Sequence, residues 1–266
     1  MATPDRARVA DRVTGVGRET GSLRRPEDLR PGPVVKICGL TRLEDVLLAW
    51  DLGAWATGFV FAPSPRRLTP AAARDLIQSA ARASTSRRPA ITIGVFGDAS
   101  AGEIAAVVRE VDLDGVQLHG LVGPGGDAVR TALAGLGRPL TGRDRPLLVI
   151  QAVPVDPENA SAESVARMVT AARAEADVVL LDTKAGGRFG GSGRVFRWSL
   201  AREAAVEGPL LVAGGIGPEN VDAALGESGT WGVDASSGVE QSPGIKDPAL
   251  MKDLIARTGA GRLQEG

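Results

Sequence analysis

The chain of 266 residues has one cysteine, one histidine and no tyrosine. A single cysteine excludes a disulfide within the chain, and one cysteine with one histidine cannot complete a Cys/His zinc site. We therefore expect no metal site. Acid–base chemistry must come from aspartate, glutamate, lysine, arginine, Cys38 or His119. This short list narrows the search for catalytic groups.

Long apolar runs and an excess of one charge are also missing. No run approaches the roughly 18 residues that a membrane-spanning helix needs. The first 30 residues lack the apolar core of a secretory signal. The 31 Lys and Arg residues nearly balance the 32 Asp and Glu residues, whereas a nucleic-acid-binding protein normally carries a basic excess. We expect a cytoplasmic protein that binds neither membranes nor nucleic acid.

What the chain does contain, from Pro33 onward, is an alternation of short apolar runs with longer amphipathic stretches. The apolar runs are typical of buried parallel strands and predict strands at 34–38, 57–61, 90–96, 115–118, 147–153, 178–182, 210–213 and 232–234. The stretches between them predict helices at about 42–53, 70–83, 101–111, 125–136, 159–175, 197–206, 218–227 and 247–258. Thr69-Pro70 and Pro218 are typical helix starts. Eight strand–helix pairs predict a single parallel (β/α)₈ TIM barrel, a fold of about 250 residues.

The barrel is predicted to span residues 34–260. Residues 1–33 have few large apolar side chains, which is typical of a disordered or loosely attached N-terminal extension. Residues 261–266 would form a C-terminal tail. An open doubly wound sheet is the alternative architecture, but it usually has fewer strands.

Polar residues at the C-terminal ends of the predicted strands are the candidates for an active site, because barrel enzymes react at that end. Side chains alternate along a strand, so Lys36 and Cys38 share a face, and a lysine charge inside the barrel would favour the Cys38 thiolate. Asp182 ends the sixth apolar run, where a carboxyl group could donate a proton or cap a helix. Cys38 could equally be a small buried apolar side chain. Position alone leaves these interpretations open.

The loops after the seventh and eighth strands are rich in glycine and serine. They contain Gly214 and Gly215, then Ser236, Ser237 and Gly238. In these barrels the two loops commonly bind a phosphate through backbone N–H groups. Ordinary turns also favour Gly and Ser, but two such loops in succession favour a phosphate site.

Other strand-end residues give weaker signals. Arg66 would hold an anionic group of a substrate, although loop arginines are usually solvated. Gln117 and His119 share a face of the fourth strand, and a lone histidine is more often packed than catalytic, so we expect these two to line the pocket. The segment 190–193 is predicted to be a mobile lid or an anion-binding turn, or else a flexible linker.

Seven segments stand in order at these strand ends: KICGLT at 36–41, GFVF at 58–61 with SPR at 64–66, VQLHG at 116–120, LLDT at 180–183, GGSG at 190–193, GGI at 214–216 with PENV at 218–221, and VDASSGVE at 233–240. Together they resemble the phosphoribosylanthranilate isomerase family, over about residues 34–259. The resemblance implies an isomerase of tryptophan biosynthesis. Its reaction would be the Amadori rearrangement of N-(5-phosphoribosyl)anthranilate to 1-(2-carboxyphenylamino)-1-deoxyribulose 5-phosphate, without a cofactor.

The resemblance also implies roles for single residues. Cys38 would be the general base that removes the C2′ proton, and Asp182 the general acid that protonates the furanose oxygen. An acid needs a raised pKa, so we expect Asp182 to be desolvated. Arg66 would hold the anthranilate carboxylate, and Asp234 would lie near the ribose hydroxyls. The phosphate would lie on the loop residues Gly214, Gly215, Ser236, Ser237 and Gly238. The expected partner is a small sugar phosphate, and the expected assembly is a monomer or a weak homodimer.

Some positions depart from the family pattern. Gln151 replaces a basic residue, Arg197 replaces an acidic one, and the loop after the fourth strand lacks an acidic residue. Two alternatives stay open, and the departures bear on the first of them. One is a paralogous phosphate-binding barrel that acts on a related aryl-aminosugar phosphate. The other is a non-catalytic phosphometabolite-binding protein, which would tolerate the loss of Cys38 and Asp182.

Overall fold

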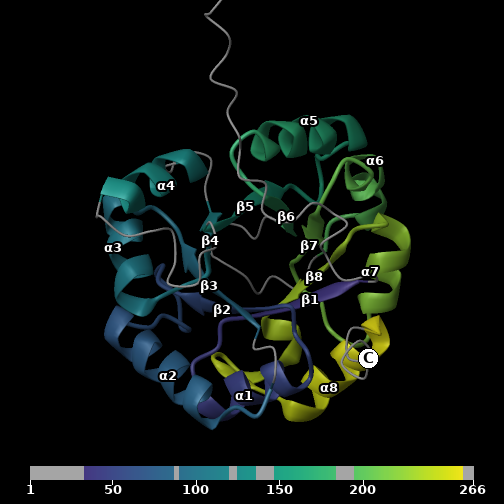
Figure 1. The fold of residues 1–266 in the computed structure, drawn as a ribbon. Coiled ribbons are helices and arrows are strands. Elements are labelled where there is room, and N and C mark those ends of the chain that lie inside the picture. Colours follow the sequence, from purple (N-terminus) through teal and green to yellow (C-terminus); the bar gives the residue numbers. More distant parts are fainter. Residues whose placement is uncertain (1–32, 87–89, 120–124, 136–146, 184–194, 260–266) are drawn as a thin grey trace, which may run out of the picture.

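The computed structural model describes residues 33–86, 90–119, 125–135, 147–183 and 195–259. Its main feature is a closed barrel of strands β1 to β8, in which each strand pairs in parallel with its neighbour and β8 pairs with β1. The helices surround this barrel (Figure 1). The predicted (β/α)₈ architecture is therefore confirmed.

The strands are β1 Val34–Cys38, β2 Ala56–Val60, β3 Ile91–Phe96, β4 Gly115–His119, β5 Leu148–Val155, β6 Val178–Thr183, β7 Leu210–Val212 and β8 Gly232–Ala235. The helices are α1 Leu43–Asp51, α2 Pro70–Ala83, α3 Ala101–Val111, α4 Gly126–Gly135, α5 Ala162–Arg173, α6 Arg202–Ala205, α7 Val221–Ser228 and α8 Pro248–Thr258. Between the main elements lie the 3₁₀ helices η2 Trp198–Ala201 and η3 Ser237–Val239, and a small antiparallel pair, β9 Glu240–Ser242 and β10 Ile245–Lys246.

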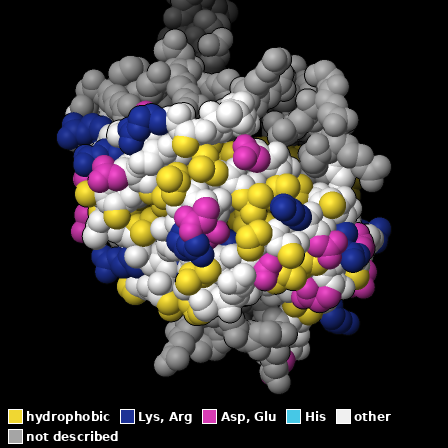
Figure 2. All heavy atoms as spheres, turned by 90° about the horizontal axis from the view of Figure 1, so that it is seen from below, with side chains coloured by type: hydrophobic (Ala, Val, Ile, Leu, Met, Phe, Trp, Pro, Cys, Tyr) yellow, Lys and Arg dark blue, Asp and Glu magenta, His cyan; other side chains and the backbone are white. Residues whose placement is uncertain are grey.

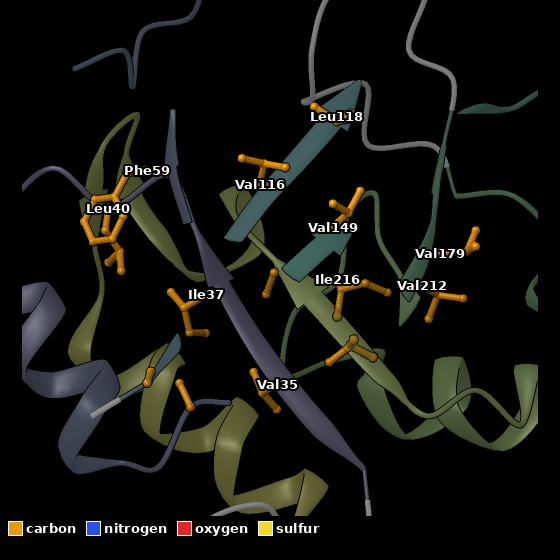
Figure 3. Packing of buried hydrophobic residues seen from close by; sticks show 14 of the residues in the cluster. Val35, Ile37, Leu40, Phe59, Val116, Leu118, Val149, Val179, Val212 and Ile216 are labelled. Atoms are coloured by element: carbon orange, nitrogen blue, oxygen red, sulfur yellow. The ribbon is translucent and has the colours of Figure 1, made fainter. Parts of the chain in front are cut away.

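Side-chain alternation along the strands produces two apolar cores. Val35 and Ile37 of β1 belong to the outer core, which packs between the barrel and its helices; Figure 3 shows them with Val116 and Leu118 of β4. The other face of each strand points into the barrel. A second cluster fills the interior with Val34, Trp55, Ala56, Ile93, Ile150, Ala152, Val178, Leu180, Leu211 and Ala213. The interior is a packed core and not a pore, as expected for this fold.

Two tryptophans lie at the N-terminal end of the barrel. Trp55 precedes β2 and Trp231 precedes β8, and their rings meet edge to face with centroids 4.8 Å apart. Trp55 belongs to the interior cluster, and Trp231 packs against it. The polar strand-end residues lie toward the other end.

Several element boundaries differ from the prediction. Thr69 caps α2 and Pro70 begins it, as predicted. The helix start at Pro218 is wrong: α7 begins at Val221. The side chain of Asn220 accepts a hydrogen bond from Gly217 N (3.0 Å) and donates one to the carbonyl of Gly215 (2.8 Å). These bonds close a turn where the helix was expected. The single helix predicted at 197–206 is instead η2 followed by the short α6.

The part of the chain that the structure describes contains no helix long and apolar enough to cross a membrane. Within the same residues, no group of His, Cys, Asp and Glu could hold a metal ion. Figure 2 shows Lys and Arg side chains mixed with Asp and Glu on one face, in keeping with the near-neutral composition. The predicted extension (apart from Pro33), the C-terminal tail and the segment 190–193 lie outside the described residues.

Candidate active site

An ion pair between the first and last strands lies inside the barrel. Lys36 and Asp234 are register neighbours on β1 and β8, and Lys36 Nζ donates to Asp234 Oδ2 at 2.9 Å. Burial raises the pKa of Asp234, and the charge of Lys36 lowers it in part. Burial acts to lower the pKa of Lys36, but the charges of Asp234 and Cys38 raise it above its ordinary value. Asp234 Oδ1 is buried and has no hydrogen-bond partner among the described residues.

Cys38 ends β1 on the same face as Lys36. It is buried and packs with Val60, Ala62 and Val95. Burial raises the pKa of the Cys38 thiol, whereas the positive charges of Lys36 and Lys246 act to lower it. The expectation that Lys36 would favour the thiolate is right about the sign of that interaction. Desolvation outweighs the lysine charge, so the net effect is a raised pKa for the thiol.

Asp182 lies on β6, within the strand, so the helix-cap interpretation is wrong. Burial raises its pKa to about 6, and the nearby charge of Asp234 acts in the same direction. Lys36 acts to lower it. The expectation of a desolvated carboxyl group with a raised pKa is confirmed. Such a group holds a proton near neutral pH far more often than an ordinary aspartate does.

The charge of Lys36 therefore acts on both Cys38 and Asp182. The two candidates come from β1 and β6, which are separate strands of the closed barrel. The positive charge of the buried Lys36 thus favours the ionised form of both the Asp182 carboxyl group and the Cys38 thiol.

Gln117 and His119 lie on the same face of β4, as predicted. Gln117 Nε2 and His119 Nε2 are 2.5 Å apart. Burial, assisted by the charge of Lys36, lowers the pKa of His119 to about 4, so its ring is neutral at physiological pH. Gln117 Oε1 is buried without a partner among the described residues. A buried acceptor of this kind is available to a ligand.

The loops after β7 and β8 lie against each other. Gly214 and Gly215 have φ angles of +87° and +73°, a backbone conformation that favours glycine. A Cβ at Gly238 would stand 2.1 Å from the carbonyl oxygen of Ile216, so the loop after β8 needs glycine at this point. The structure thus brings the predicted phosphate residues Gly214, Gly215 and Gly238 into two adjoining turns. Ser236 and Ser237 precede Gly238, and Ser237 is exposed.

Arg66 is not a solvated loop arginine. Its Nε and Nη2 donate to Oε1 and Oε2 of Glu240, at 2.8 and 2.6 Å. Glu240 also accepts a hydrogen bond from the buried ammonium of Lys246, at 2.8 Å. Neither partner was predicted. Glu240 ends the last family-like segment, and Lys246 stands just before the Asp247-Pro248 helix start. These positions are the signals that could have identified them.

Two of the departures from the family pattern, Gln151 and Arg197, lie away from the barrel interior. Gln151 alternates with Ile150 and Ala152, which belong to the interior cluster, and its amide donates to the carbonyls of Leu118 and Ala152. Arg197 is exposed at the start of η2. Residues 120–124 of the loop after β4 lie outside the described residues.

The fold and the site define a class: a (β/α)₈-barrel enzyme with acid–base groups at the C-terminal ends of its strands. Comparison with known proteins gives the family. Residues 35–129 and 143–257 match the family model described as N-(5'phosphoribosyl)anthranilate (PRA) isomerase. The N-(5'-phosphoribosyl)anthranilate isomerase of Geotalea uraniireducens is 38% identical over 225 residues, which cover 84% of this chain and 97% of that protein. The chain belongs to the phosphoribosylanthranilate isomerase family and is an isomerase.

Solved structures agree. The phosphoribosyl anthranilate isomerase of Thermotoga maritima superposes with a TM-score of 0.67 at 34% identity, covering 85% of this chain and 98% of that one. A phosphoribosyl anthranilate isomerase in complex with reduced 1-(o-carboxyphenylamino)-1-deoxyribulose 5-phosphate superposes with a TM-score of 0.64 at 32% identity, covering 85% and 98% of the two chains.

Proposed function

We propose that this chain converts N-(5-phosphoribosyl)anthranilate to 1-(2-carboxyphenylamino)-1-deoxyribulose 5-phosphate in tryptophan biosynthesis, with Asp182 as general acid and Cys38 as general base. The observation that supports these roles best is the shared environment of the two groups. Both lie at the same end of the barrel, and the charge of the buried Lys36 acts on both.

The chemistry assigns one proton transfer to each group. Asp182 gives a proton to the furanose oxygen as the C1′–O bond breaks, and the anthranilate nitrogen lone pair forms a C=N bond. Cys38 then removes the C2′ proton, and the resulting enol rearranges to the ketone of the product. Each general acid or base of this kind typically contributes about 10²–10⁴-fold to the rate.

The two pKa values suit opposite tasks. A pKa of about 6 leaves Asp182 protonated in about a tenth of molecules at pH 7, and the carboxylate left by the proton transfer regains a proton for the next cycle. Burial disfavours the Cys38 thiolate, but the thiolate that forms beside Lys36 and Lys246 is a stronger base because of the raised pKa.

The remaining residues would bind the substrate. Asp234 Oδ1 and Gln117 Oε1, both buried acceptors, suit the ribose hydroxyls, and the neutral His119 would line the same pocket. Arg66 would hold the anthranilate carboxylate. The phosphate would lie on backbone amides of Gly214, Gly215, Ser236, Ser237 and Gly238. The relative solved with a reduced product analogue supports a ligand that carries both a carboxylate and a phosphate.

Neither described departure favours another substrate, because Gln151 and Arg197 lie outside the barrel interior. A cytoplasmic location and a monomer or weak homodimer remain predictions.

Turnover of the purified chain, followed by loss of the fluorescent substrate, tests the proposal. We expect turnover in the wild type, and losses of about 10²–10⁴-fold in kcat for Cys38→Ser and Asp182→Asn. Asp177→Asn is the matched control, because Asp177 is another partly buried aspartate with a raised pKa, located at the start of β6 and not at its end. A wild type that neither turns over the substrate nor rescues a tryptophan auxotroph lacking this step would refute the function. Full activity in either variant would remove that residue from the mechanism.

A further inference from the structure

Lys246 of β10 is a buried lysine whose hydrogen bonds are all accounted for. Its Nζ donates to the carbonyl of Cys38 (2.6 Å), to the carbonyl of Ser236 (3.0 Å) and to Glu240 Oε1 (2.8 Å). An ammonium group has three N–H donors, so each has one acceptor. The side chain is fully buried. A lysine with this geometry is held in one position.

Lys246 sits where the pairing between β1 and β8 stops. The last register pair of these strands is Ile37 and Ala235. The carbonyls of the next residues, Cys38 and Ser236, accept hydrogen bonds from the lysine. The backbone N–H of Lys246 donates to Asp45 of α1 at 3.1 Å, which anchors the β9–β10 pair from the outside. Lys246 is therefore a rigid support for Glu240, the side chain with which it forms an ion pair.

Glu240 links Lys246 to Arg66. Its Oε1 accepts from Lys246 Nζ and from Arg66 Nε, and its Oε2 accepts from Arg66 Nη2. Burial acts to raise the pKa of Glu240, but its hydrogen bond with Arg66 and the charge of Lys246 hold that pKa below its ordinary value. Glu240 is thus a carboxylate with a cation on either side.

This contact uses one edge of the Arg66 guanidinium and leaves another available. Glu240 takes the Nε–Nη2 edge, and no described residue accepts a hydrogen bond from Nη1. The Nη1–Nη2 edge can therefore bind a second carboxylate through two parallel hydrogen bonds. A lysine at position 66 could not serve two carboxylates in this way, because an ammonium is a point charge without a planar fork.

We propose that Glu240, supported by Lys246, is a positioning residue that presents the Nη1–Nη2 edge of Arg66 to the carboxylate of the substrate. The inference rests on the proposed function, in that it takes Arg66 to bind the anthranilate carboxylate. Glu240 itself does not touch the substrate. It acts by fixing a long side chain that would otherwise lose rotamer freedom when the substrate binds.

Glu240→Gln tests this with little change in shape. The amide oxygen can still accept from Lys246, but the amide NH₂ then faces an N–H of Arg66, donor against donor. We expect KM to rise about 10- to 100-fold, the value of a hydrogen bond to a charged group, while kcat stays near wild type. A substrate analogue without the carboxylate should show no such difference between the two proteins. Arg66→Lys should also bind the substrate more weakly than wild type, because an ammonium cannot contact Glu240 and the substrate carboxylate through two separate edges.

A double-mutant cycle separates positioning from a general structural role. In an Arg66→Ala background, Glu240→Gln should raise KM little further, since the residue through which it acts is gone. Asp177→Asn serves as control, because it weakens another partly buried pair, with Arg130 (2.7 Å), and should leave KM unchanged. Equal effects of Glu240→Gln on KM in both backgrounds, or an unchanged KM in a wild-type background, would overturn the inference. Absence of turnover in the wild type would instead count against the function.

Discussion

The raised pKa of Asp182 has a consequence for stability that can be calculated. Its value of about 6 in the folded protein lies above the ordinary 3.8, a difference of about 2 units that corresponds to about 3 kcal/mol. Because the folded state binds the proton more tightly, the stability linked to this group is fully present below pH 3.8. It is lost as the pH rises through about 6. At neutral pH the carboxylate therefore opposes folding.

Asp182→Asn should then stabilise the protein at neutral pH, although it lowers kcat. Asparagine is similar in size and carries no charge at any pH. We expect the free energy of unfolding of the variant, relative to wild type, to increase by about 2.5 kcal/mol between about pH 4 and about pH 8. Urea unfolding at both pH values measures it. Taking the difference between the pH values cancels any contribution of the introduced amide that does not depend on pH. The same relative stability at both pH values, or a variant that weakens as the pH rises, would refute the reasoning.

Three further predictions follow from the described geometry. Gly214→Ala should lower thermal stability and raise KM, because alanine rarely adopts the positive φ of Gly214. The control is Gly226→Ala inside α7, where a Cβ would meet open space, and it should be neutral or stabilising. The ring of His119, the one histidine, should stay neutral by nitrogen-15 NMR at every pH above about 5, since its pKa is lowered to about 4; protonation near pH 6.5 would contradict this. Lys36→Met should lower the free energy of unfolding, measured with urea, by about 3–5 kcal/mol, because it leaves the Asp234 carboxylate buried without its cation. A decrease below about 1 kcal/mol would refute that account.

The sequence was sufficient to predict the barrel because each strand is indicated by its own few residues. β-branched runs of a few residues predict buried strands, and strand alternation correctly places Lys36 with Cys38 and Gln117 with His119 on shared faces. The raised pKa of Asp182 also follows from its position at the end of an apolar strand.

The sequence was not sufficient where two distant segments decide the outcome. The net effect on Cys38 depends on how completely the folded chain excludes water, which a strand pattern does not measure. Glu240 meets Arg66 across 174 positions, and Lys246 meets Cys38 across 208. The helix start at Pro218 failed for a local reason, since the Asn220 side chain competes with the helix for the same backbone groups.

The ion pair between Lys36 and Asp234 joins residues 198 positions apart, on the first and last strands of the ring. A nascent chain that still lacks its eighth strand therefore carries a lysine destined for the interior with no counterion to accompany it. The end of the barrel that carries Cys38, Asp182 and Asp234 can take shape only when the ring closes, so the appearance of activity during synthesis or refolding should coincide with the pairing of the final strand.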